Sequence, residues 1–216
     1  MEISPEDALF GARIKQLFEA KEMQESVVAI IESCLKKALR NKKCDYFIAF
    51  QIEDSSGHFS DSHRLFFRDT FLGITLWRRS PPDDSAADHF PVAHLGFTFP
   101  VRPKNTLCIM QIQGVDLKRA KDYRMWTESF IKRAVGRIRW EEALLTVAAK
   151  VGEAVGMEKL AILPARKNLY FDDTELSRLS EKALARNQRL FDRYDRNAIR
   201  LGMETDPSFQ LYVRPL

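Results

Sequence analysis

WEEALLTVAAKVGEAVGMEKLAIL, at positions 140–163, is the stretch of sequence that decides the fold. Its apolar residues recur at helical spacing over Trp140–Val155, and Gly156 ends the helix because glycine readily adopts the left-handed conformation of a helix C-terminus. The short apolar run Lys159–Leu163 follows at once and is closed by Pro164, as expected of a buried strand. The stretch therefore predicts one helix–strand unit of a mixed α/β protein.

The sequence after this unit repeats the alternation of helix and strand. A pattern dense in alternating charge predicts one long helix from about Thr174 to Leu201, and Gly202 stops it. The chain then ends in a predicted strand over Phe209–Val213.

The sequence before this unit predicts two helices and then a series of strands. Ser4 and Pro5 mark a helix start, because a hydroxyl group caps the first turn and proline suits its first position. The predicted helices cover Pro5–Ala20 and Met23–Arg40, and runs of β-branched and aromatic residues predict strands over Asp45–Ile52, Leu65–Arg78, Ala93–Val101 and Leu107–Val115. The longest of these runs is expected to hold two strands or a bulge, at Asp69 or Gly73.

Together these patterns predict an α+β protein with a central, mostly antiparallel sheet flanked by helices. We expect a single domain over residues 1–216, made of N-terminal helices (1–43), a strand meander (44–115) and a helix–strand half (116–216). A chain of this length with 45% hydrophobic residues can bury a sizeable core.

Composition excludes several classes of protein. No apolar run is long enough to span a bilayer, and the acidic start Glu6–Asp7 is unlike a secretory leader. Cys34, Cys44 and Cys108 lie in apolar runs without metal-ligand spacing, so we expect reduced thiols, a cytoplasmic protein and no metal. The net charge of +4 is small and interspersed, which argues against nucleic acid as the main partner.

A candidate anion site precedes the 140–155 helix. Arg133, Gly136 and Arg137 stand just before it, where backbone N–H groups, the positive helix end and guanidinium charge together can hold a phosphate. The alternative is that Gly136 allows close helix packing and that the arginines form a solvated face. The pattern Arg-x-x-Gly alone carries little information, so its position between a strand and a helix is its main support.

The order of these elements resembles the core of the N-acetyltransferase (GNAT-like) fold. That order is a strand, an Arg-x-x-Gly-x-Ile loop, a helix ending in Gly-Met, a buried strand and a long helix ending in Leu-Gly-Met. A looser resemblance is to the VirK-like family of uncharacterised bacterial proteins, through Ile112–Gly114, Gly136–Arg139 and Tyr194–Asp195. The first resemblance implies an acyl-CoA-dependent N-acyltransferase that uses acetyl-CoA or a longer acyl-CoA. Its acceptor would be the amine of a small molecule or of a protein.

The GNAT-like resemblance also implies roles for single residues. A tyrosine, Tyr194 or Tyr170, would protonate the leaving thiolate, and His94 or a water would deprotonate the amine. The chain departs from the family pattern at Ile138, where a second glycine is usual, and at Ala198, where the tyrosine is expected. Backbone N–H groups of the 107–115 strand would hold the thioester carbonyl. The residues expected to bind coenzyme A are Gln113 on that strand and the loop residues Arg133, Val135, Gly136, Arg137 and Ile138.

Other readings of the sequence stay open. The same scaffold can serve as a non-catalytic interaction module that docks on a protein partner, or on a second copy, through its N-terminal helices. His58 and His63 are more typical of surface histidines than of a metal site, because no third ligand is visible. An RNA-binding sheet would use exposed aromatic residues interleaved with cations, although core packing explains most of these aromatics: Phe47, Phe50, Phe66, Phe67, Phe71, Trp77, Phe97 and Phe99.

Overall fold

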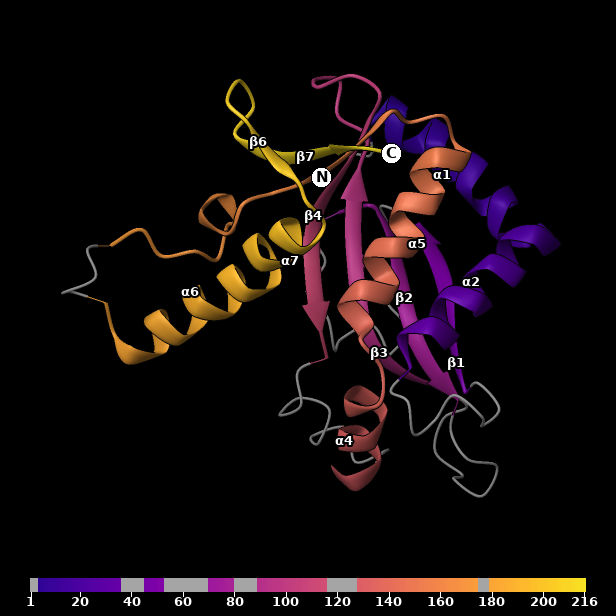
Figure 1. Ribbon diagram of the computed structural model, residues 1–216, viewed down its shortest axis with the longest axis horizontal. Coiled ribbons are helices and arrows are strands. Elements are labelled where there is room, and N and C mark those ends of the chain that lie inside the picture. Colours follow the sequence, from indigo (N-terminus) through magenta and orange to yellow (C-terminus); the bar gives the residue numbers. More distant parts are fainter. Residues whose placement is uncertain (1–3, 36–44, 53–69, 80–88, 116–127, 175–178) are drawn as a thin grey trace.

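A computed structural model of the chain describes residues 4–35, 45–52, 70–79, 89–115, 128–174 and 179–216 (Figure 1). These residues form a mixed α/β fold around one seven-stranded sheet with the order β1-β2-β3-β4-β5-β7-β6. Every neighbouring pair is antiparallel except β4 and β5, which run parallel. The strands are β1 (Tyr46–Ile52), β2 (Leu72–Arg79), β3 (His89–Thr98), β4 (Thr106–Gly114), β5 (Lys159–Ile162), β6 (Glu204–Asp206) and β7 (Leu211–Pro215).

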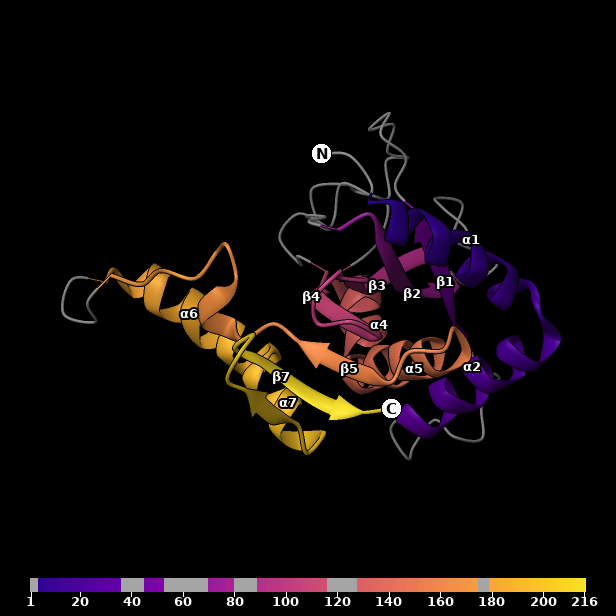
Figure 2. The same cartoon turned by 90° about the horizontal axis from the view of Figure 1, so that it is seen from above.

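One face of the sheet is covered by three helices. Figures 1 and 2 show α5 (Trp140–Ala154) lying across β2, β3 and β4, with α2 (Lys21–Cys34) packed beside it and α1 (Pro5–Glu19) over β1. The apolar stripe of α5 is buried, so this helix contributes a large share of the residues that form the hydrophobic core. Its buried residues include Ala143, Leu144, Val147, Ala148 and Val151.

The parallel pair β4–β5 is joined by a crossover that contains α4 (Glu128–Gly136) and α5. After β5 the chain passes through the 3₁₀ turn η3 (Ala165–Lys167) into α6 (Glu181–Arg193) and α7 (Asp195–Arg200), and then into the β6–β7 hairpin. In Figure 1, α6 extends away from the sheet on the side of β4 that is opposite β1 and β2. The edge of β4 therefore lies between the helix-covered core and this C-terminal arm.

The predicted elements agree with most of the described fold. The helix of 140–155, the β5 strand, the first helix and the four strands of the meander are confirmed, with ends that differ by a few residues. The strand meander was expected from Leu65, but residues 65–69 lie outside the described part of the chain, as does the second helix beyond Leu35. Leu35 itself is extended and bridges to Ile138, so that helix ends at Cys34.

Two predictions of local structure are wrong. The single helix expected over 174–201 is broken at Tyr194, which ends α6 and starts α7. The expected phosphate-binding loop is helical as far as Gly136, because Phe130, Ile131 and Ala134 bury one face of α4 against the core. The strand β6 was missed, since its three residues, Glu204–Asp206, have no apolar alternation of their own.

A buried carboxylate ties α1 to the end of β3. Asp7 is 6% exposed, and its carboxylate accepts hydrogen bonds from the Phe99 backbone N–H at 2.8 Å and from the Thr98 hydroxyl at 2.8 Å. Because the carboxylate replaces water for a buried backbone N–H, its loss leaves an unsatisfied donor. Asp7 thus belongs to the first turn of α1 and also connects that helix to the sheet.

We expect Asp7→Ala to lower the free energy of unfolding by about 1–3 kcal/mol, because the Phe99 N–H would remain buried without a partner. Denaturant unfolding of the purified variant measures the effect. Glu19→Ala, at an exposed acid of the same helix, is the matched control and should change stability by less than about 0.5 kcal/mol. Equal effects of both substitutions would contradict a role for the Asp7 bonds.

Candidate functional site

The pairing between strands β4 and β5 ends halfway along β4. They pair from Thr106–Lys159 to Ile109–Ile162, and the Leu163 N–H still donates to the Ile109 carbonyl at 3.0 Å. Pro164 and η3 then carry the chain away, while β4 continues to Gly114. From Met110 onward, no strand of the described residues lies beside the edge of β4 that faces away from β3.

A bulge in β4 lies at the same place. On β3, Gly96 pairs with Gln111 and Phe97 pairs with Ile109, so Met110 is the extra residue. A bulge turns the backbone groups that follow it toward the opposite edge of the strand. The Met110 carbonyl and the Ile112 N–H consequently point into the gap that β5 leaves.

The hydroxyl of Tyr194 occupies that gap. It accepts hydrogen bonds from the Ile112 N–H at 3.1 Å and from the Asn168 Nδ2 at 3.1 Å, and donates to the Met110 carbonyl at 3.2 Å. The side chain is 2% exposed. Because buried backbone groups must find partners, the hydroxyl stands in for the missing strand at this point.

The break between α6 and α7 is what aims Tyr194 at β4. Asp195, directly after it, accepts from the Ala165 N–H at 3.0 Å through Oδ2 and from the Tyr212 hydroxyl at 2.6 Å through Oδ1. The start of α7 is thereby fixed to both η3 and β7. The hydrogen bond to Asp195, together with burial, raises the pKa of Tyr212 to about 12.

A cavity of about 200 Å³ opens beside Tyr194, between β4 and α6. Its floor is the outer edge of β4, its near wall is the segment after η3, and its far wall is α6. Three of the predicted site residues, Gln113, Tyr170 and Tyr194, come together here. The described residues that line it are Gln111, Ile112, Gln113, Asn168, Tyr170, Arg186, Arg189, Leu190, Arg193 and Tyr194.

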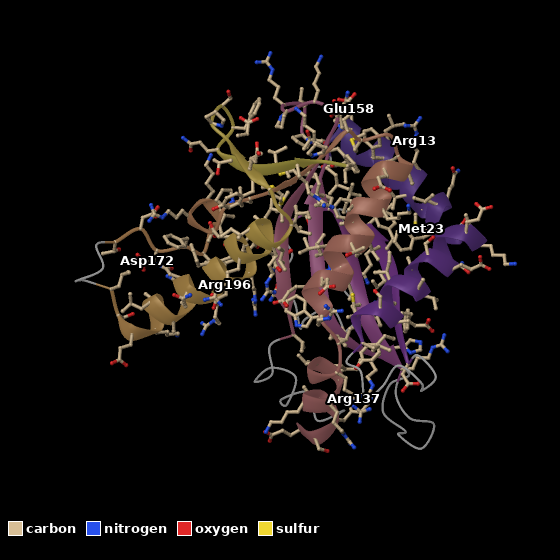
Figure 3. The ribbon with its side chains drawn as sticks, in the orientation of Figure 1. Arg13, Met23, Arg137, Glu158, Asp172 and Arg196 are labelled. Atoms are coloured by element: carbon tan, nitrogen blue, oxygen red, sulfur yellow. The ribbon has the colours of Figure 1, made fainter. Side chains whose placement is uncertain are left out.

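The predicted coenzyme A loop lies elsewhere. Arg133 is on α4 and donates from Nε to the Ser129 carbonyl at 3.1 Å within that helix, and Ile138 is buried and bridges to Leu35. Figure 3 shows Arg137 beside the end of α4, far from Asp172 next to α6. A Cβ on Gly136 would meet no atom of the described residues within 4 Å, so packing among these residues does not require this glycine. Val135 belongs to the same turn of α4.

His94 is buried on β3, away from the lining of the cavity. One ring nitrogen, Nδ1, lies 2.9 Å from the Thr75 hydroxyl, which itself donates to Gln51. In the β3–β4 register His94 stands opposite Gln113, whose side chain accepts from Gln111 at 2.9 Å. The histidine is therefore one strand behind the cavity floor, in a row of polar side chains that crosses the sheet.

The remaining candidates have structural explanations. Burial raises the pKa of the Cys108 thiol to about 12, which makes it a poor nucleophile near neutral pH. Phe97 and Phe99 are buried in the core, as core packing predicts, while Phe66 and Phe67 lie outside the described residues together with His58 and His63.

Comparison of the chain with protein-family models, with curated protein sequences and with solved structures found no match. Within the described ranges, no three His, Cys, Asp or Glu side chains gather in a group that could hold a metal ion. None of the helices in the part of the chain that the structure describes is long and apolar enough to cross a bilayer.

The sequence interpretation missed the cationic wall of the cavity. Arg186, Arg189 and Arg193 follow one another at spacings of three and four residues, which places them on one face of a helix. That spacing was a signal available in the sequence, although alternating charge along this segment resembles an ordinary solvated helix. Asn168 gave no signal, because only the tertiary fold brings it to Tyr194.

The Tyr212–Asp195 hydrogen bond makes stability depend on pH. Since the folded-state pKa of Tyr212 is raised from 10.0 to about 12, the stabilisation is fully present below pH 10 and is lost as the pH rises through about 12. We expect the wild type to be more stable than Tyr212→Phe near neutral pH and to lose this advantage at high pH. Denaturant unfolding of both proteins across this range measures it, and a pH-independent difference would contradict the assignment.

Proposed function

We propose that the chain is an acyl-CoA-dependent N-acyltransferase that binds its acyl thioester in the cavity between β4 and α6. The observation that carries the proposal is the open edge of β4, where the Ile112 N–H and the Tyr194 hydroxyl meet at the cavity. A backbone N–H can stabilise the oxyanion of acyl transfer from a thioester, and a tyrosine hydroxyl can act as its general acid. The resemblance of the sequence to the GNAT-like fold is a second support for the proposal.

In this proposal the thioester carbonyl takes the hydrogen bond of the Ile112 N–H. This displaces the Tyr194 hydroxyl from that donor, while Asn168 continues to hold it through Nδ2. The same N–H then stabilises the oxyanion that forms when the amine attacks the carbonyl carbon. To protonate the sulfur, the Tyr194 hydroxyl turns its proton away from the Met110 carbonyl, to which it donates in the free protein.

The proton and bond changes balance as follows. A C–N bond forms between the amine and the carbonyl carbon, the C–S bond breaks, and the thiolate takes the Tyr194 proton. The nitrogen loses one proton to water at the cavity mouth, and a proton from solvent restores the tyrosine. Tyr170, on the cavity wall, is placed to contact the acceptor, whereas His94 lies one strand away from the reacting atoms.

A non-catalytic interaction module is the second candidate, and one observation favours it. The Tyr194 hydroxyl already makes three hydrogen bonds within the chain, as a purely structural side chain would. Leu9 and Val28 are exposed apolar residues on the N-terminal helices and would lie in the docking surface. The two candidates differ in whether an acyl-CoA enters the cavity.

We place the reaction in the cytoplasm. Cys34 and Cys108 are buried free thiols, as expected in a reducing compartment. Such a compartment also keeps the thiol of a coenzyme A product reduced.

Thermal unfolding with acetyl-CoA and with longer acyl-CoAs tests the proposal. A ligand that binds only the folded chain raises the midpoint, by several degrees at about a hundred times its dissociation constant. No rise with any acyl-CoA at millimolar concentration would overturn the acyltransferase proposal and favour the interaction module.

A pair of tyrosine variants separates catalysis from packing. In Tyr194→Phe the buried ring remains and the Asp195 bonds still hold the junction of α6 and α7. The Ile112 N–H becomes free for the thioester, so the folded variant should keep acyl-CoA binding while thiol release to an amine panel falls about 10²-fold or more. Tyr46→Phe is the matched control, because its buried hydroxyl donates to the Ala134 carbonyl at 2.7 Å away from the cavity. Equal turnover in the two variants would exclude Tyr194 as the acid.

A further inference from the structure

The far wall of the cavity carries a concentration of positive charge. Three guanidinium groups, of Arg186, Arg189 and Arg193, line it, and no carboxylate is among the described residues that line the cavity. On an isolated helix, like charges three and four residues apart are destabilising. An arrangement that costs stability in the free protein is expected where an anion binds.

The internal partners of these arginines neutralise them only in part. Arg186 pairs with Asp172 through NH2 at 3.2 Å, yet its buried Nε has no hydrogen-bond partner among the described residues. Arg193 lies over the Trp140 ring, with 6.0 Å between its guanidinium carbon and the ring centroid, and the charge of Glu141 acts on it as a counter-charge. Both arginines line the same cavity.

Of the three arginines, Arg189 has the positive charge that is least offset by neighbouring groups. It is exposed, and no residue in the described ranges forms a hydrogen bond or ion pair with it. Its charge also lowers the pKa of Arg193, in addition to the larger effect of burial on that group. An anion between the two guanidinium groups would remove this repulsion and make charge-assisted hydrogen bonds.

The positive charge at the start of α5, where the sequence predicts the phosphate site, is already offset by acidic side chains. Glu141 and Glu142 stand in its first turn, where their charges offset the positive helix end. Arg139 pairs with Glu142 at 2.7 Å and donates to the Ser33 carbonyl at 2.9 Å. Trp140 packs closely over Gly114, where an added Cβ would lie 3.1 Å from the ring.

The geometry points to a phosphate-binding site on α6, in which Arg186, Arg189 and Arg193 hold the phosphate groups of the ligand whose acyl end lies against β4. The site joins the Tyr194 region within one cavity, so a single extended ligand spans both. The identification of that ligand as a coenzyme A thioester rests on the proposed function. The anion site itself rests on the arginines alone.

Calorimetric titration with acetyl-CoA, with the phosphate-free acetyl-pantetheine and with inorganic pyrophosphate tests the site. Arg189→Gln should weaken acetyl-CoA and pyrophosphate by about tenfold each, as expected for the loss of a charge-assisted bond, and leave acetyl-pantetheine unchanged. Arg196→Gln, at an exposed arginine of α7 outside the cavity, is the matched control and should leave all three affinities unchanged. Arg133→Gln with Arg137→Gln tests the rival position beside α5.

The outcomes separate the two proposals. Pyrophosphate binding that Arg189→Gln weakens about tenfold, in a protein that binds no acetyl-CoA or acetyl-pantetheine, supports the anion site and overturns the acyltransferase. Acetyl-CoA binding that is weakened by the Arg133 and Arg137 changes and not by Arg189→Gln overturns the α6 site and keeps the acyltransferase. Pyrophosphate affinity that is equal in wild type and Arg189→Gln also overturns the α6 site.

Discussion

The hydrogen bonds between Tyr194 and β4 are the interaction on which the rest of the C-terminal half depends. Because β5 ends its pairing at Ile162, the Met110 carbonyl and the Ile112 N–H need another partner. One hydroxyl satisfies both and in doing so fixes where α6 stops and α7 begins. The hydrogen bonds of Asp195 with the Ala165 N–H and the Tyr212 hydroxyl fix that junction, and with it the C-terminal end of the α6 wall, to η3 and β7.

The attachment of α6 through Tyr194 also explains how this helix can pack against the sheet at one end and line a cavity along the rest of its length. The C-terminal end of α6 is fixed through Tyr194, while the rest of the helix projects past the edge of the sheet (Figure 1). The face of α6 that looks back at β4 is therefore separated from it by a cavity instead of by packed side chains. A helix held in this way can carry Arg186, Arg189 and Arg193 at a cost in stability that an anionic ligand would offset.

The sequence predicted those parts of the fold whose signals are local. Pro5 and Gly156 mark helix ends by their own backbone preferences, and the apolar stripe of 140–155 determines its burial. The break at Tyr194 was missed because the charge pattern of a surface helix continues across it, while the bonds that cause the break come from β4. For the same reason the candidate site was predicted only in part. Gln113, Tyr170 and Tyr194 meet at the cavity, but the segment expected to be a phosphate loop from Arg133 is helical as far as Gly136, in a helix whose burial depends on distant residues.

The most direct measurement is a crystal structure of the protein with a non-transferable acyl-CoA analogue. The account predicts the thioester-equivalent carbonyl oxygen within hydrogen-bond distance of the Ile112 N–H, the Tyr194 hydroxyl turned from that donor toward the sulfur position, and phosphates among the arginines of α6. A ligand bound beside Arg133 and Arg137, with all three Tyr194 hydrogen bonds intact, would contradict it.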